Sequence, residues 1–206
     1  MPKGSLKLTN ARKEEIINAC ELLYKTMSFK EITMKDIASA TSFTRTSIYN
    51  YFETKEEIFL ALLKREYELW VASLNKLICE HSELSLDEVA SLLARSLAER
   101  KQLLKLLSMN HYDMEQNSRE EKLVEMKTAY GNSMKTVNLY LQKFCRGMSE
   151  KDRENFIYIF FPFMFGAYPY AVVTDKQKEA MKQAQVEYSY LSVYEILYNC
   201  IKTLLG

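Results

Sequence analysis

The chain has 206 residues, of which 48% are hydrophobic and 27% charged, a composition that is typical of globular proteins and excludes an intrinsically disordered chain. Only five glycines and three prolines are present, which favours short loops and a mostly helical protein. Because the formal net charge is only +1, a uniformly basic surface is excluded, and any nucleic-acid contact must come from a local patch.

Helix starts can be located from a Ser or Thr that is followed three residues later by an acid or Gln. The hydroxyl accepts from a backbone N–H of the first turn, and the third residue reaches back. Such pairs begin at Thr33, Thr54, Ser85, Ser118, Ser149 and Thr174. Together with apolar residues spaced three and four apart, they predict an all-α fold. The expected helices cover about residues 10–27, 33–40, 44–51, 54–78, 85–97, 99–109, 118–145, 149–173 and 188–205, with a polar segment before the last helix.

Residues 33–52 have the pattern of two short helices joined by a tight turn. Ile37 and Ala38 on the first helix, and Ile48 and Phe52 on the second, are spaced to form an apolar centre against the helix at 10–27. Residues 1–52 carry eight basic and five acidic side chains. This excess of positive charge has the sign that the negatively charged DNA backbone attracts. A helical hairpin whose polar face only meets water fits the same pattern.

The second of these helices carries side chains suited to a DNA groove. We expect Thr44 to cap it, Arg45 to bind guanine edges, Asn50 to bind adenine, and Thr46 to contact a polar edge or a thymine methyl. The remaining candidates are expected to contact phosphates: Ser47, Tyr49, Lys55 at the start of the next helix, and Thr33 and Lys35 at the start of the preceding one.

The run IASATSFTRTSIYNYFETKEEIF resembles the DNA-binding signature of TetR-family transcriptional regulators, and the likeness covers about residues 10 to 60. The matching features are a small residue after the isoleucine, a hydroxyl that opens the recognition helix, a hydroxyl before aliphatic-Tyr, an aromatic-Phe pair, and Ser/Thr-Lys-Glu at the next helix. In this chain they are Ala38, Thr44, Ser47-Ile48-Tyr49, Tyr51-Phe52 and Thr54-Lys55-Glu56.

Two positions depart from the family pattern, which usually has glycine in the turn and at the third position of the recognition helix. This chain has Ser42 and Thr46 there. Ser42 is therefore expected to need a positive φ, at a cost of about 1 kcal/mol. Because Thr46 adds a methyl and a hydroxyl where the family brings backbone near DNA, the family's base preference does not carry over.

The resemblance implies a helix-turn-helix domain at residues 1–52 and an effector-binding and dimerisation domain at 53–206. It further implies a homodimer in which C-terminal helices pair as a four-helix bundle, and a pocket between the middle helices that takes a small-molecule effector. Leu191, Tyr194, Tyr198, Ile201 and Leu205 recur at spacings of 3, 4, 3 and 4, a seam suited to a partner helix. Packing of the same seam within one subunit is the alternative.

Residues 156–173 form an uncharged aromatic stretch of 18 residues that is interrupted by Pro162, Gly166 and Pro169. The interruptions favour a buried helix over a membrane span, and the prolines predict a kink or local unwinding that opens space between helices. We expect an apolar or aromatic effector there, contacted by Trp70, Met109, Tyr112, Met126, Tyr130, Met134, Phe161, Met164, Phe165 and Tyr168. Ordinary core packing with Met as a filler is the alternative.

Other functional classes find little support. The chain has no Gly-rich phosphate loop, no GxSxG and only two histidines, His81 and His111, without metal-ligand spacing; we expect no enzyme, metal or cofactor. Four scattered cysteines predict reduced thiols in the cytoplasm. The expected function is a ligand-controlled regulator of operator DNA, with repression as the favoured sign. The alternative is a helical ligand-binding or scaffold protein that does not bind DNA.

Overall fold

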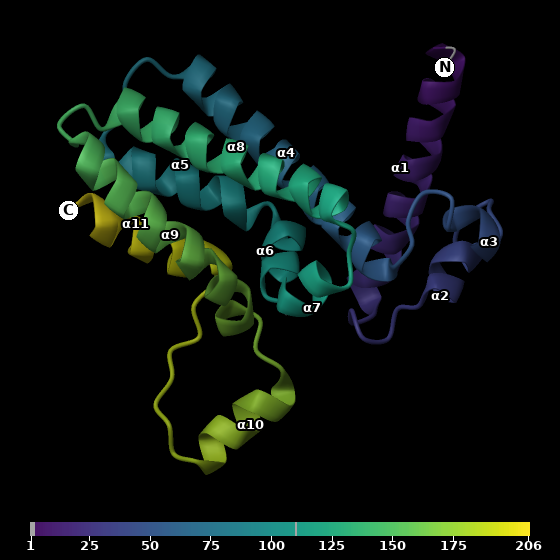
Figure 1. Ribbon diagram of the computed structural model, residues 1–206. Coiled ribbons are helices and arrows are strands. Elements are labelled where there is room, and N and C mark those ends of the chain that lie inside the picture. Colours follow the sequence, from purple (N-terminus) through teal and green to yellow (C-terminus); the bar gives the residue numbers. More distant parts are fainter. Residues whose placement is uncertain (1–2, 110) are drawn as a thin grey trace. The chain divides into compact units, whose positions relative to one another are not determined.

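The computed structural model describes the backbone of residues 3–109 and 111–206, and the side chains of all of these except 3–6, 111 and 113. Within them it contains eleven helices and no strand, which confirms the all-α prediction (Figure 1). The helices are α1 (Lys3–Thr26), α2 (Met34–Ser39), α3 (Arg45–Ile48), α4 (Lys55–Glu80), α5 (Leu86–Ala98), α6 (Lys101–Leu107), α7 (His111–Gln116), α8 (Glu120–Phe144), α9 (Glu150–Ala171), α10 (Asp175–Gln183) and α11 (Val193–Leu205).

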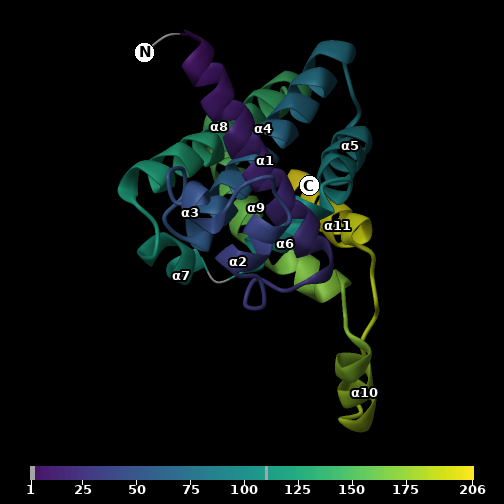
Figure 2. The ribbon, with the colours of Figure 1, turned by 90° about the vertical axis from the view of Figure 1, so that its right-hand side faces the viewer.

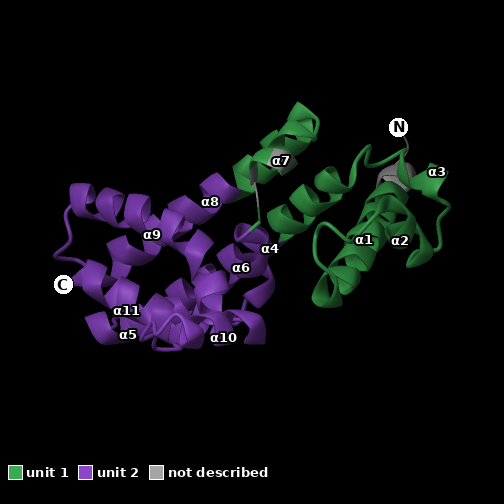
Figure 3. Ribbon diagram, turned by 90° about the horizontal axis from the view of Figure 1, so that it is seen from below, with its two compact units in different colours: residues 1–65, 109–129 green, residues 66–108, 130–206 purple. Residues whose placement is uncertain are grey.

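The chain divides into two compact units (Figure 3). Unit 1 holds residues 1–65 and 109–129, and unit 2 holds residues 66–108 and 130–206. Two long helices, α4 and α8, contribute their N-terminal parts to unit 1 and the rest to unit 2.

Most of the predicted helix starts are caps in the structure. Thr33, Ser85 and Ser149 each form a complete capping box with the acid three residues on. Ser118 is the exception, because its hydroxyl donates to the carbonyl of Met114 at 2.7 Å. The carbonyl of Arg119 instead accepts the first bonds of α8, so this helix begins one position later than Ser118 predicts.

Two short helices lie where the sequence pattern predicts none. The first, α7, falls between two expected helices, and the second, α10, occupies the polar segment before α11. Thr174 caps α10 through a bond from the amide of Gln177, so the capping signal is correct although the pattern predicts no helix after it. Residues 150–171 form one unbroken helix through Pro162 and Pro169, so the local unwinding expected for this stretch is wrong, while the alternative of a kink stays a prediction.

Each unit has its own apolar core. In unit 1, α1, α2 and α3 surround buried residues that include Ile16, Cys20, Ile37, Ile48 and Phe52. In unit 2, α11 lies against α5 and α9, and the buried residues include Leu93, Leu97, Phe160, Leu197 and Ile201. α10 buries no residue and projects from the rest of unit 2 between two extended segments, as Figures 1 and 2 both show.

Among the described helices, none is by itself long and apolar enough to cross a bilayer. Only the pair α9 and α10, bent by 85° at their junction, passes by combined length and composition.

Candidate nucleic-acid interface

The start of α3 is fixed by the side chain of Thr44. Its Oγ1 accepts from the amide of Ser47 at 3.2 Å and lies 2.9 Å from the Ser47 hydroxyl, so both hydroxyls take part in the cap. Ile48 is fully buried and holds α3 against the core of unit 1. The predicted base-contacting residues Arg45, Thr46 and Asn50 are left exposed.

Arg45 and Tyr49 form a pair on the exposed side of α3. The guanidinium donates to the Tyr49 hydroxyl from Nε at 3.1 Å and from Nη2 at 2.9 Å, and it lies 5.6 Å from the ring centroid. The contact holds a long side chain along the helix surface, which reduces the rotamer entropy that Arg45 would lose on binding DNA. Tyr49 is 40% exposed.

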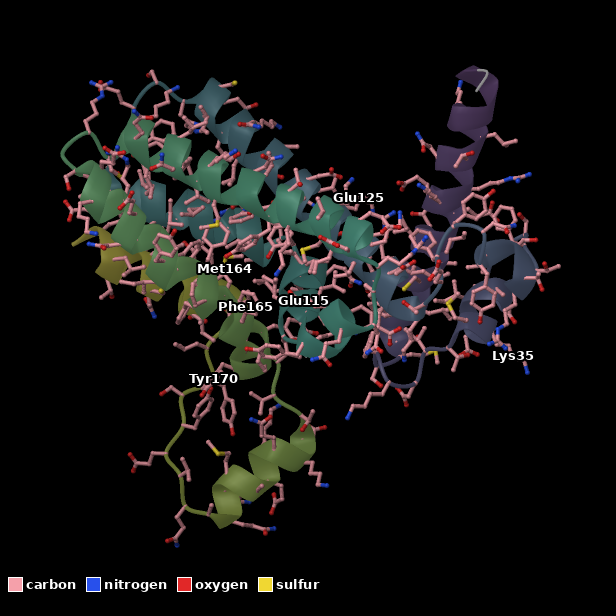
Figure 4. The ribbon with its side chains drawn as sticks, viewed as in Figure 1. Lys35, Glu115, Glu125, Met164, Phe165 and Tyr170 are labelled. Carbon is pink, nitrogen blue, oxygen red and sulfur yellow. The ribbon has the colours of Figure 1, made fainter. Side chains whose placement is uncertain are left out.

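The start of α2 lies close to α3. The Thr33 hydroxyl accepts from the amide of Asp36 at 3.3 Å. It also donates to the Asp36 carboxylate at 2.6 Å, as the Thr33 amide does at 2.9 Å, and these two donors keep the pKa of Asp36 below its usual value. Lys35 is exposed on α2 (Figure 4). Thr33, Lys35, Arg45 and Lys55 line one cleft of about 270 Å³, which brings together residues from α2, α3 and α4.

Lys55 has a different role from the one predicted. Its Nζ donates to the carbonyl oxygens of Phe29 at 2.7 Å and Ile32 at 3.0 Å, and lies 4.4 Å from the centroid of the Phe29 ring. These contacts tie the first turn of α4 to the segment between α1 and α2. The ammonium therefore completes the fold of unit 1, and the prediction of a phosphate contact is corrected on that ground.

The turn between α2 and α3 is held by α1. The amide of Ser42 donates to Glu15 Oε1 at 2.7 Å, which lowers the pKa of Glu15. Ser42 does not adopt the positive φ expected from the missing glycine; Gln185 is the one non-glycine residue of the described chain that does. Arg12, a basic residue that the motif analysis did not single out, donates to the Tyr51 hydroxyl at 3.1 Å and lies over the Phe43 ring.

Family models match both parts of the chain. The model described as bacterial regulatory proteins, tetR family, matches residues 16–62, and the model described as tetracyclin repressor-like, C-terminal domain, matches residues 64–205. The chain belongs to the TetR family. It is thus a TetR-family transcriptional regulator with a DNA-binding N-terminal domain, and members of this family are regulators rather than enzymes.

One relative is similar in sequence to part of this chain, and several solved structures share its fold. The HTH-type transcriptional regulator YfiR of Bacillus subtilis (strain 168) is 29% identical over 75 residues, which span 36% of this chain and 37% of that one. The fatty acid degradation regulator FadR of Bacillus halodurans has the same fold, with a TM-score of 0.61 at 16% identity over 94% of this chain and 97% of that chain. FadR of Thermus thermophilus, a repressor solved with lauroyl-CoA, has a TM-score of 0.59 to this chain at 18% identity, over 94% of this chain and 93% of that chain.

The residues predicted to line an effector pocket fall in both units of this TetR-family protein. In unit 2, Tyr130 of α8 lies against Phe161 of α9, with centroids 5.5 Å apart, and Trp70 of α4 lies 5.9 Å from Phe161. The indole Nε1 of Trp70 donates to Ser96 Oγ at 3.0 Å. Tyr67, which the pattern missed, completes the cluster 5.6 Å from Tyr130.

The other predicted pocket residues differ in burial. Met164 is fully buried on α9, while Phe165 and Tyr168 on the same helix and Met134 on α8 are half-buried (Figure 4). Met109, Tyr112 and Met126 belong to unit 1. Of these, Tyr112 is 78% exposed in this structure, and its place in an effector pocket stays a prediction.

The seam predicted for the dimer lies against α5 of the same chain. Ile201 is fully buried there, the Tyr194 hydroxyl lies 2.9 Å from Ser91 Oγ, and the Tyr198 hydroxyl donates to Asp87 at 2.6 Å. These three residues therefore contact α5 of the same chain, as in the alternative of packing within one subunit, and a role of the α11 seam in the dimer stays a prediction. Leu191 remains exposed and Leu205 half-exposed.

Proposed function

We propose that this regulator binds a double-stranded operator as a symmetric pair of subunits, each placing α3 in a major groove. The observation that carries the proposal is the outward face at α3, where Arg45, Thr46, Tyr49 and Asn50 are exposed while Ile48 is buried against the core of unit 1. In helix-turn-helix proteins the N-terminal residues of the second helix contact base edges, and half-sites lie about 34 Å apart.

The test is selection of duplexes from a random library by the purified protein, followed by titration at several salt concentrations. We expect an inverted repeat whose affinity falls as salt rises, since phosphate contacts release counterions. Arg45→Ala should weaken binding by about 10- to 100-fold and relax the preference at one base position. Failure to enrich any sequence, with no salt-dependent binding, would favour the scaffold alternative.

A second copy of this chain is the partner that the proposal requires, and members of the family act as dimers. We place the contact on α9 in preference to the α11 seam. Tyr158, Ile159, Phe163 and Tyr170 of α9 are large apolar side chains with exposed fractions of 71%, 52%, 36% and 62%. Ile159, Phe163 and Tyr170 are spaced to lie along one face of the helix, and burial of such an apolar stripe stabilises association.

A groove adjoins this stripe. It has a volume of about 410 Å³, and its walls come from α9, the segment after α10 and the start of α11: Pro162, Phe163, Gly166, Ala167, Tyr170, Tyr188, Ser189, Leu191 and Ile196. Leu191 is the member of the predicted seam that the proposal keeps. In the dimer, side chains of the partner subunit would fill this groove.

We propose that an apolar or aromatic small molecule controls operator affinity by entering unit 2 at the cluster of Trp70, Tyr130 and Phe161. The rings contact one another and Trp70 is fully buried, so a ligand must separate them and shift α8 or α9. A ligand that prefers the shifted state would lower the affinity for DNA, which is repression relieved by ligand.

The single tryptophan of the chain makes this step measurable. Trp70 emission should change on titration with a ligand that reaches the cluster, and Phe161→Ala should alter the affinity. Lauroyl-CoA is the first probe, because the Thermus thermophilus FadR of the same fold was solved with it, and tetraphenylphosphonium tests the preference for aromatic cations. Coenzyme A without the acyl chain is the control. No spectral change with any apolar probe would contradict this site.

A further inference from the structure

A buried carboxylate lies at the first turn of α4, away from the residues that face the DNA groove. Glu57 is fully buried, and its Oε2 accepts from the amide of Glu53 at 2.8 Å. The amide of Glu57 in turn donates to Thr54 Oγ1 at 3.2 Å, so this acid belongs to the cap of α4. A buried charge is costly unless it is paired and hydrogen-bonded.

Arg119, from the second chain segment of unit 1, pairs with the Glu57 carboxylate. Its Nε donates to Glu57 Oε1 at 2.6 Å and its Nη2 to Oε2 at 2.8 Å, which is a two-point contact between guanidinium and carboxylate. The Arg119 amide also donates to Oε1, at 3.2 Å. Burial raises the pKa of Glu57, but the bonds from Arg119 and Glu53 outweigh it and leave the pKa lowered. The carboxylate is therefore charged at neutral pH.

The same arginine reaches the turn that follows the recognition helix α3. Its Nη2 lies 3.4 Å from the carbonyl oxygen of Tyr51, two residues before Glu53. Nearby, Thr54 Oγ1 donates to the carbonyl of Asn117 at 2.9 Å, and Lys122 Nζ lies 5.9 Å from the centroid of Phe52. Segment 51–57 is thus held to segment 117–122 by several contacts, of which the two-point contact between Arg119 and Glu57 is the charged one.

We propose that Arg119 is a positioning residue for operator binding: it holds the turn that follows α3, at Tyr51, and the first turn of α4 to the start of α8. Arg119 accepts the first backbone bonds of α8, and α8 continues from unit 1 into unit 2. Movement of α8 would then reach the recognition helix through Arg119 and Glu57. The proposal rests on the proposed function and names a residue through which DNA binding is regulated.

The first measurement uses hydrogen exchange of the whole protein without DNA. Arg119→Met should raise the exchange of amides 51–57 by about tenfold or more, since a charge-assisted contact is lost. The matched control is Arg65→Met, which removes another arginine of unit 1 that bonds to Glu14, Asn18 and Glu21. It should leave amides 51–57 within about twofold of the wild type. Unchanged exchange at 51–57 in Arg119→Met would overturn the proposal.

The second measurement is binding of a duplex that the wild-type protein has selected, at several salt concentrations. Arg119→Met should bind about tenfold more weakly with an unchanged salt slope, because Arg119 orders α3 without contacting phosphate. A slope smaller by about 0.9 would mean that Arg119 is itself a phosphate contact, which also overturns the proposal. If Arg119→Met folds poorly, Arg119→Lys replaces it, because lysine keeps the charge beside Glu57. Arg119→Lys should also weaken DNA binding with an unchanged salt slope, but by a smaller factor.

The two measurements separate this inference from the function on which it rests. If the wild type selects no duplex, the proposed function fails, while the exchange result still decides whether Arg119 fastens the turn that follows α3.

Discussion

Lys55 Nζ donates to the carbonyl oxygen of Phe29 at 2.7 Å, across 26 positions of the sequence. A lysine at the start of a helix that follows a recognition helix is well placed for a DNA phosphate, yet this ammonium bonds to two backbone carbonyls and lies over an aromatic ring. The exposed lysine of the same cleft is Lys35, on α2. The two lysines therefore have separable roles.

Lys55→Met should lower the free energy of unfolding by about 1–3 kcal/mol, because it leaves two carbonyls without their charged donor. The salt slope of DNA binding should stay the same. Lys35→Met is the matched control and should behave in the opposite way, with unchanged stability and a slope smaller by about 0.9. Urea unfolding and anisotropy titrations of a selected duplex measure both. A reduced slope for Lys55→Met would restore it as a phosphate contact.

The Arg45–Tyr49 pair predicts coupled effects on DNA binding. Tyr49→Phe removes the hydroxyl that accepts both guanidinium bonds, so Arg45 loses its fixed position, and we expect affinity to fall by roughly threefold to tenfold. In the double variant Arg45→Ala, Tyr49→Phe the loss should be smaller than the product of the two single losses. Fully additive losses in titrations of the selected duplex would mean that the two side chains act on DNA independently.

Glu57 predicts how stability depends on pH. Its pKa is lowered in the folded protein, so the ion pair with Arg119 contributes stability above the unfolded-state pKa of the carboxyl, and this contribution is lost as pH falls through the lowered folded-state value. Glu57→Gln should be less stable than the wild type at pH 7, by about 1–3 kcal/mol, and the difference should shrink below about pH 4. Urea unfolding between pH 7 and pH 3 measures it. A difference that stays constant over this range would show that the charge of Glu57 is not what stabilises the contact.

The stripe on α9 predicts a variant that separates the subunits. Phe163→Glu places a charge beside the apolar groove, where burial against a second copy would be costly, so the dimer should dissociate at micromolar concentration. The control is Tyr112→Glu, which changes an exposed aromatic residue of unit 1 that lies outside the proposed dimer contact. This variant should sediment as a dimer, as the wild type does. Dissociation by Tyr112→Glu, or none by Phe163→Glu, would place the dimer contact elsewhere.

The aromatic cluster in unit 2 was predicted only in part from the sequence. The prolines of residues 156–173 and the aromatic and methionine side chains predicted that Trp70, Tyr130 and Phe161 share a space between helices, and the structure does bring these three together. The same prediction omitted Tyr67, which joins them, and included Tyr112, which is exposed. A helical period states which residues share a face, but the element that covers the face depends on how helices from distant parts of the chain are placed.

The sequence by itself determined the all-α class, most helix starts and the recognition helix, because caps and the residues of a short helix act over three or four positions. Tertiary structure decided that Lys55 bonds to backbone, that α5 covers the α11 seam, and that Arg119 meets Glu57 across 62 positions. Such long-range partners follow from burial and from the need to pair buried charge, and neither is visible in local spacing.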